Sequence, residues 1–167
     1  MARKTAPQLE ASARGLRLAL LRAAFNVEIV TGLAQGARAA FLAAGGRARD
    51  LVEVEIPGAF ELPLASKVAA ESGSFDAVVA LGAVVRGDTD HYEHVAREAA
   101  AGLQRAMLET RTPIAFGVLT TRSAAQALRR AAPGAENKGG EALRAALAMV
   151  HALRLLRGRP ARRPGRR

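Results

Sequence analysis

Apolar segments of two lengths alternate along the chain. The short ones have the length and the Val, Ile, Leu and Ala content of buried strands, and they cover residues 16–21, 51–56, 75–85 and 113–119. The long ones repeat apolar residues at helical spacing, and they cover residues 27–44, 60–72, 91–110, 123–132 and 137–157. Because short links join strand to helix throughout, the order predicts an α/β domain whose parallel sheet is covered by helices on both faces.

Glycine and proline mark several ends of these predicted elements. Gly45 and Gly46 follow the first predicted helix, as expected of residues that end a helix. Pro57 and Gly58 turn the chain after the second strand, and Pro63 falls in the first turn of the second helix, where proline is tolerated. The positions of these glycines and prolines therefore agree with the element boundaries that the apolar pattern indicates.

Composition narrows the class of protein. A chain of 167 residues, half of them hydrophobic, is long enough for one domain with a sizeable core. It contains no cysteine, which excludes disulfides and thiolate metal sites. Residues 1–14 lack the apolar core of a signal peptide, and the longest uncharged apolar stretch, residues 77–85, is too short to span a membrane. We therefore expect a cytoplasmic protein.

The net charge of +10 is concentrated toward the two ends of the chain. Residues 158–167 contain five arginines and no acidic residue, together with proline and glycine. Such a segment cannot bury a core, so we expect a disordered basic tail that is a solvated extension. Electrostatic contact of this tail with nucleic acid is the alternative. The expected organisation is an N-terminal arm over residues 1–14, one domain over residues 15–157, and the tail.

Polar or aromatic residues follow every predicted strand. The carboxyl ends of parallel strands meet at one edge of the sheet, where open α/β sheets bind their ligands. The glycine-rich patterns of dinucleotide-binding and P-loop proteins are both absent, which argues against those two classes. The segments at the strand ends are residues 25–26, 57–63, 86–91 and 116–121.

These segments carry a resemblance to a known family. The motif P-G-A-x-E-x-P begins at Pro57, R-G-D-T-x-H begins at Arg86, F-G-V-L-T begins at Phe116, and N-K-G begins at Asn137. Each motif alone is weak, but their joint order and spacing are very specific. The chain resembles the lumazine synthase family over about residues 7–156.

The resemblance implies a fold and a reaction. The fold is a flavodoxin-like three-layer α/β/α sandwich with a four-stranded parallel sheet. The reaction condenses 5-amino-6-(D-ribitylamino)uracil with 3,4-dihydroxy-2-butanone 4-phosphate, through an imine, to give 6,7-dimethyl-8-ribityllumazine in riboflavin biosynthesis. Phosphate and water leave, and no metal or redox cofactor is needed. The enzyme class is a transferase, and its partners are small-molecule substrates and copies of the same chain.

The resemblance also implies the roles of individual residues. His91 matches the catalytic histidine, and the ordinary histidine pKa of about 6.5 suits proton transfer near neutral pH. Phe25 matches the aromatic residue that stacks on the flat heterocycle. The ribityl chain and the ring would be held by segments at two strand ends, which consist of Ala59, Phe60 and Glu61 and of Ala83, Val84 and Val85.

Phosphate would bind at two other places. Backbone N–H groups of Asp88 and Thr89 lie near the start of the third predicted helix, where an anion is favoured. The Arg130 guanidinium can donate a fork of hydrogen bonds to phosphate oxygens. Phe116 and Lys138 match further substrate-binding positions.

In the family the pocket lies between neighbours in a pentamer. The resemblance implies that the stacking, ribityl-binding and proton-transfer residues come from one chain, and that Phe116, Arg130 and Lys138 come from the next. Two departures stand out: Ala24 replaces a frequent arginine, and residues 132–134 replace a frequent Gly-Thr-Lys link. That link has no insertion here, which resembles the members whose pentamers form capsids. Because the link contains Pro133, the resemblance does not decide between a pentamer and a capsid.

Parts of the sequence are compatible with three other functions. His91 and His94, helped by Glu98, share one helix face and could ligate a metal, but no third cluster supports such a site. A non-catalytic flavin- or pterin-binding protein would need neither His91 nor Arg130. A nucleic-acid-binding module would rest on the basic tail alone. His94 and His151 are expected on a helix surface or at an interface.

Overall fold

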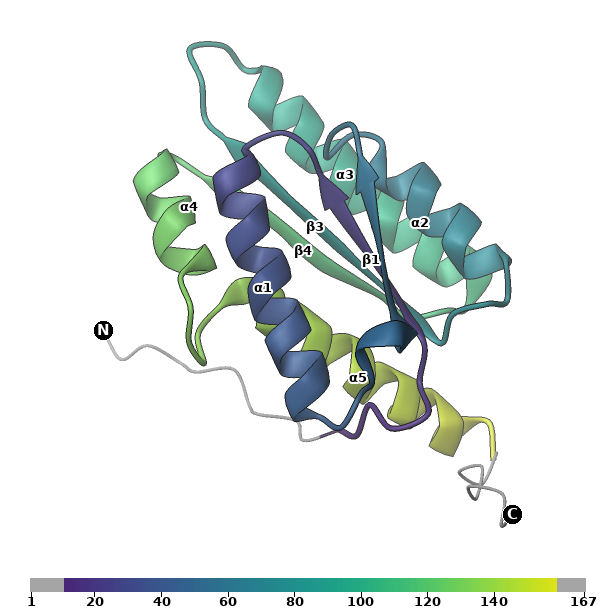
Figure 1. Ribbon diagram of the computed structural model, residues 1–167. Helices are drawn as coiled ribbons and strands as arrows, with labels where there is room; N and C mark the ends of the chain where they lie inside the picture. The colour runs from purple at the N-terminus through teal and green to yellow at the C-terminus, as the bar shows by residue number, and fades with distance from the viewer. Residues whose placement is uncertain (1–10, 159–167) are drawn as a thin grey trace.

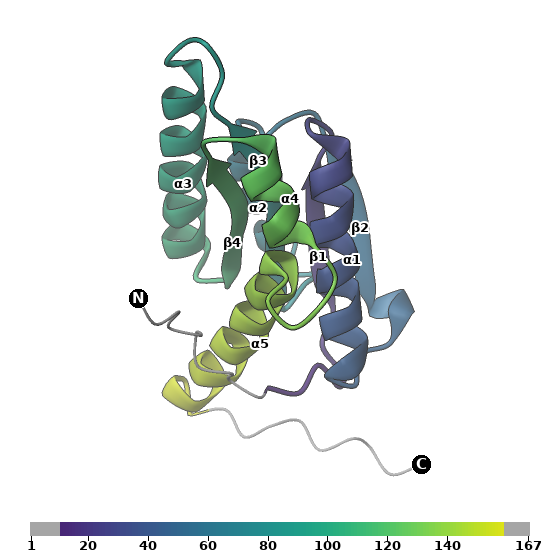
Figure 2. The same ribbon diagram turned by 90° about the vertical axis from the view of Figure 1, so that its left-hand side faces the viewer.

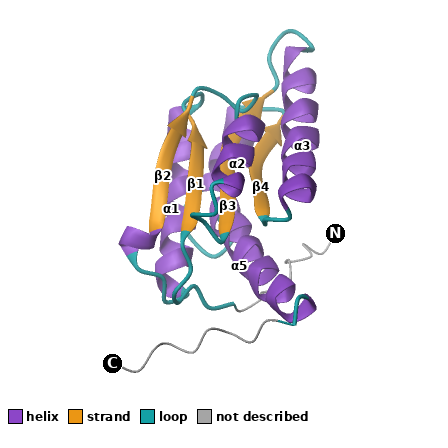
Figure 3. Ribbon diagram, turned by 90° about the vertical axis from the view of Figure 1, so that its right-hand side faces the viewer, coloured by secondary structure: helices purple, strands orange, loops and turns teal. Residues whose placement is uncertain are grey.

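The computed structural model describes residues 11–158 and contains one sheet of four parallel strands in the order β2-β1-β3-β4 (Figure 1; Figure 3). Because β1 and β3 lie inside the sheet, their carboxyl ends are flanked by neighbours on both sides. The strands are β1 (Leu18–Ala23), β2 (Leu51–Ile56), β3 (Ala77–Val85) and β4 (Ile114–Thr121).

Five α-helices and one short 3-10 helix connect the strands. Helices α2 and α3 cover one face of the sheet, and α1, α4 and α5 cover the other (Figure 2). The helices are α1 (Val27–Ala43), α2 (Leu62–Glu71), α3 (His91–Thr110), α4 (Ala124–Ala131) and α5 (Lys138–Leu156), with the 3-10 helix η1 at Ala48–Asp50. The three-layer α/β/α sandwich with a four-stranded parallel sheet that the sequence predicts is confirmed.

The sheet separates two hydrophobic cores. On the side of α1 and α5, the fully buried side chains include Leu33, Phe41 and Leu143. On the side of α2 and α3, they include Leu62 and Leu103. Strand β3 contributes to both cores and is buried along nearly its whole length, as its uninterrupted apolar sequence predicts for a central parallel strand.

The first strand begins later than the sequence predicts. Leu16 is buried, but its N–H donates to the Ala13 carbonyl at 3.1 Å, and Gly15 before it has a φ of +72°. This segment is therefore a turn packed on the core, and Leu18 is the first residue in register with both neighbouring strands. Because Ala13 is also buried, the packed region begins before the domain limit expected at residue 15.

The other boundaries agree closely with the predictions. Strand β2 and helix α3 have the predicted limits, and each remaining α-helix starts and ends within two residues of its prediction. Ser123 and Asn137, predicted as first helical residues, are instead the residues whose side chains cap α4 and α5. The 3-10 helix was not predicted. Most of the expected N-terminal arm and all of the basic tail after Gly158 lie outside the described residues.

Candidate active site

A cavity of about 520 Å³ opens at the carboxyl ends of β1, β2 and β3. It is enclosed by the loop after β1, the loop after β2, the last residues of β3 and the first two turns of α3. Its apolar floor and few polar groups are typical of a small-molecule site. The lining residues are Phe25, Asn26, Gly58, Ala59, Phe60, Glu61, Ala83, Val84, Val85, His91, Tyr92, His94 and Val95.

An aromatic ring and a carboxylate lie over Gly58. A methyl group on Gly58 would be 3.0 Å from the Glu61 Oε2 atom and 3.5 Å from the Phe25 ring. The Phe25 side chain is 73% exposed, so little of its own chain covers it. A core phenylalanine would be buried, and this one is instead available to stack on a flat ligand.

The loop after β2 leads into α2. Ala59 is buried, whereas Phe60 is more than half exposed beside the cavity. Glu61 stands at the N-cap position of α2, but its side chain makes no capping hydrogen bond. The Glu61 carboxylate therefore faces the cavity as a hydrogen-bond acceptor instead of closing the first turn of the helix.

The end of β3 forms another part of the cavity wall. Ala83, Val84 and Val85 remain paired with β4, but the register between β1 and β3 ends where Arg22 lies opposite Leu81. Backbone groups at the end of β3 are thus released from one neighbour and become available to a ligand. One of them is already used, because the Asn26 side-chain amide donates to the Ala83 carbonyl at 2.8 Å.

His91 is the first residue of α3 and lines the cavity. His94 is exposed on the surface of α3, as the sequence predicts, and it also lines the cavity one turn after His91. Tyr92 and Val95 also line the cavity and were not predicted. Residues three and four after His91 share its helix face, so helical spacing alone could have identified His94 and Val95.

Tyr92 is held by two neighbours. Its hydroxyl donates to the Glu93 Oε1 atom at 3.0 Å, and this hydrogen bond raises the pKa of Tyr92 above its ordinary value. The Arg86 guanidinium lies 5.7 Å from the centre of the Tyr92 ring. Tyr92 therefore offers the cavity a neutral phenol.

Asp88 and Thr89 lie in the exposed loop that projects beyond the sheet between β3 and α3 (Figure 1). They precede Asp90, which is the N-cap residue of α3, and neither lines the cavity. The side chain of Asp90 makes no capping bond. The Glu93 N–H donates to the Asp90 carbonyl at 2.9 Å, and the N–H groups before it at the start of α3 remain a suitable place for an anion.

The other predicted site residues lie apart from the cavity. Phe116 is on the edge strand β4 and is 48% exposed. Arg130 is exposed on α4, where its Nη1 atom donates to the Gln126 carbonyl at 3.2 Å. Lys138 begins α5 and pairs with Glu141 at 2.7 Å. Within residues 11–158, the candidate residues thus form two separate groups, and none of these three lines the cavity.

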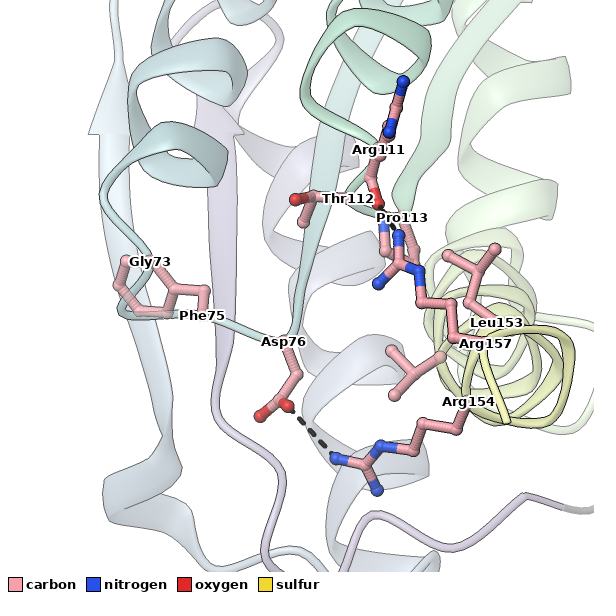
Figure 4. Close-up of a pocket in the computed structure, with 10 residues that line it drawn as sticks. Gly73, Phe75, Asp76, Arg111, Thr112, Pro113, Leu153, Arg154 and Arg157 are labelled. Atoms are coloured by element: carbon pink, nitrogen blue, oxygen red, sulfur yellow. Dashed lines mark hydrogen bonds and ion pairs between the residues drawn. The ribbon is translucent and has the colours of Figure 1, made fainter. Parts of the chain in front are cut away.

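A larger cavity, of about 670 Å³, lies at the amino ends of β3 and β4 (Figure 4). Arg154 pairs with Asp76 at 3.2 Å, and Arg157 donates to the Arg111 carbonyl at 2.7 Å. Helices α3 and α5 end here, so basic side chains compensate the negative ends of both helices. These contacts tie α5 to the sheet and to α3, which accounts for the basic residues without a ligand.

In residues 11–158, no three histidine, aspartate or glutamate side chains are grouped as a metal site would require. Over the same residues, every helix is too short or too polar to cross a membrane.

Comparison with known proteins gives one consistent result. Residues 15–154 match the family model described as 6,7-dimethyl-8-ribityllumazine synthase. The protein of that name from Deinococcus radiodurans is 48% identical over 145 residues, which cover 87% of this chain and 92% of the relative. Its namesake from Thermus thermophilus is 47% identical over 85% of this chain and 90% of its own length. The Chlorobium chlorochromatii protein is 47% identical over 86% and 92%, respectively.

Proposed function

The chain belongs to the 6,7-dimethyl-8-ribityllumazine synthase family, and we propose that its catalytic centre is the cavity at the carboxyl ends of β1, β2 and β3, completed by a second copy of the chain. The enzyme is a transferase of riboflavin biosynthesis. It condenses 5-amino-6-(D-ribitylamino)uracil with 3,4-dihydroxy-2-butanone 4-phosphate and releases phosphate and water. A cytoplasmic location is part of the proposal.

One observation carries the assignment of the site. The cavity brings together Phe25, Glu61 and His91, which come from three separate strand ends. The exposed ring of Phe25 would stack on the uracil, and the Glu61 carboxylate would accept hydrogen bonds from the ribityl hydroxyls. Free backbone groups at the end of β3 would pair with the polar edge of the pyrimidine.

The chemistry needs proton transfers at two stages. The 5-amino group of the uracil attacks the ketone carbon, and the resulting carbinolamine loses water to form the imine. Loss of phosphate and attack by the ribityl-bearing nitrogen then close the second ring, with loss of another water. We assign these proton transfers to His91, since an imidazole can both accept and donate a proton near neutral pH.

The residues that bind the phosphate group are assigned to a neighbouring chain. Arg130 would bind the phosphate by a forked pair of hydrogen bonds, with Lys138 nearby and Phe116 closing the site. The separation of these residues from the cavity within one chain supports a site shared between subunits. Exposed apolar side chains on α2 and α3, including Leu64 and Leu108, offer a surface for such association. We propose a homopentamer; a 60-subunit capsid of such pentamers is the alternative assembly.

The proposed function is tested by mixing purified protein with both substrates and following the absorbance of 6,7-dimethyl-8-ribityllumazine. Omission of either substrate is the control, because the uncatalysed condensation must be subtracted. Enzyme-dependent product formation is expected. Tight binding of the product or of a flavin without any turnover would contradict this function and favour a binding protein on the same scaffold.

A further inference from the structure

Asn26 has an unusual backbone for a residue that begins a helix. It occupies the N-cap position of α1 with a φ of 55° and a ψ of 48°. This left-handed conformation is unfavourable for residues that carry a side chain, although asparagine tolerates it better than most. Among the non-glycine residues that the structure describes, only Arg111 shares a positive φ. Such a conformation persists where the surroundings hold it in place.

The side chain of Asn26 is not used in the ordinary way. An N-cap asparagine usually accepts a hydrogen bond from the first turn of its helix, and Asn26 makes no such bond. Its amide instead donates to the Ala83 carbonyl at 2.8 Å. That carbonyl lies beyond the last residue pair that β1 and β3 share. The side chain thus links β3 to the chain at the point where β1 has left the sheet.

The residue held by this link is Phe25. Its ring is mostly exposed, so packing within the chain does little to fix it. The backbone on each side is fixed instead: the Ala24 N–H donates to the Ile56 carbonyl at 2.8 Å, and Asn26 is tied to β3. With both flanking residues anchored to the two neighbours of β1, the ring is directed over Gly58.

We propose that Asn26 is a positioning residue whose link to Ala83 holds Phe25 in the orientation that stacks on the heterocycle. The inference rests on the proposed function of the cavity. It explains both the left-handed backbone of Asn26 and the absence of a capping bond from its side chain, because both serve to hold the stacking surface in its orientation before the ligand binds.

The test is a double-mutant cycle read as the dissociation constant of 6,7-dimethyl-8-ribityllumazine. Asn26→Gly keeps the left-handed backbone and removes the amide, and Asn26→Asp keeps the size but has no N–H to donate to Ala83. Phe25→Ala should weaken product binding by about 10-fold, as expected for loss of one stacking ring. Either Asn26 variant should weaken it by about fivefold, because a displaced ring retains only part of its contact.

In the Phe25→Ala background, Asn26→Gly should add less than about a twofold further change, since the two residues act through one ring. Arg111→Gly is the matched control: it relaxes the other left-handed residue, far from the cavity, and should leave product binding unchanged. The circular dichroism spectrum and Tm of each variant check that it folds. If Asn26→Gly does not fold, Asn26→Asp takes its place in the cycle.

Two results would overturn the inference. The first is that both Asn26 variants bind product as the wild type does. The second is a full additive loss in the double variant, which would show that Asn26 acts independently of Phe25. Failure of the proposed function itself is distinguished by the wild-type protein, which would then form no product from the two substrates whether or not it binds the product.

Discussion

At the scale of single residues, His91 is expected to control the rate of proton transfer. His91→Ala should lower kcat by about 100-fold while leaving product affinity largely intact, because positioned acid–base groups contribute about that factor. His151→Ala is a matched control, since His151 lies on α5 and contacts the Ser12 carbonyl at 2.7 Å. Steady-state kinetics at saturating substrate measure the effect. An unchanged kcat in His91→Ala would remove His91 from the chemistry.

Arg130 is expected to act on one substrate only. Arg130→Ala should raise the KM for the butanone phosphate by at least about 10-fold and change the KM for the uracil much less, because only the former carries phosphate. Arg130→Lys should rescue it partly, since a lysine keeps the charge but loses the fork. Separate titrations of the two substrates measure this. Equal effects on both KM values would show a structural role instead.

At the scale of elements, Asn137 joins three helices. It is buried, accepts hydrogen bonds from Gly139 and Gly140 at the start of α5, and donates to the Gly32, Ala131 and Ala132 carbonyls. Its side chain thus caps α5 while holding the end of α4 and the middle of α1. Loss of this residue leaves several buried groups without partners.

Asn137→Ala should therefore lower the free energy of unfolding by about 3 kcal/mol, as the sum of a lost cap and unsatisfied buried groups. Ser123→Ala is the control, because this exposed cap of α4 accepts a single hydrogen bond, from Gln126, and should cost about 1 kcal/mol. Chemical or thermal unfolding compares the two. An equal loss in both variants would mean that the interhelical bonds of Asn137 add nothing.

An exposed ion pair links α2 to α3 and makes this contact sensitive to pH. Hydrogen bonding to Lys67 at 2.8 Å lowers the pKa of Glu109, and the pKa of Lys67 is raised in return. The Glu109 contribution to stability is present above its unfolded-state pKa and is lost as the pH falls through the lowered folded-state pKa. Lys67 adds its own part below its unfolded-state pKa, and this part is lost as the pH rises through the raised value.

Lys67→Met should accordingly lower Tm slightly near neutral pH, and the difference from the wild type should shrink as acid protonates Glu109 or as salt screens the pair. Thermal melts at a series of pH values measure this difference. A difference that stays constant down to acid pH would mean that packing of the Lys67 stem, not its charge, matters.

Much of the element pattern could be predicted, because apolar spacing and cap residues are local signals. The start of β1 could not be predicted in this way. Leu16 is apolar, as a strand residue would be, but pairing with both neighbouring strands begins only at Leu18. Gly36 inside α1 has no local explanation either. A side chain there would overlap Asn137, so this glycine depends on how closely α1 approaches the start of α5.

The candidate site was only partly predictable for a similar reason. Motifs identified Phe25, Glu61 and His91, which lie at strand and helix ends. Asn26 and Tyr92 act through partners on other elements or on the loop before α3, and a linear sequence does not show such partners. The resemblance to a known family implied that Phe116, Arg130 and Lys138 form a group apart from the cavity, whereas the apolar pattern alone could not show this division.

At the scale of the whole molecule, the main feature is that the candidate residues form two separate groups within one chain. The cavity carries the stacking and proton-transfer residues, whereas Arg130 lies on another part of the chain. If neighbouring chains complete each other, a chain lacking His91 and a chain lacking Arg130 can still form intact sites between them. A site contained in one chain could not be restored in this way.

The most direct measurement is therefore the activity of mixed oligomers that contain His91→Ala and Arg130→Ala chains in equal amounts, co-expressed with different tags and purified through both. Random mixing in a closed ring of head-to-tail interfaces should restore about a quarter of the wild-type activity per site, because half of the chains retain each residue. The assay uses a butanone phosphate concentration well below the raised KM of Arg130→Ala, so oligomers of either variant alone should stay at low rates. Verified mixed oligomers that are no more active than the two variants would contradict the shared site.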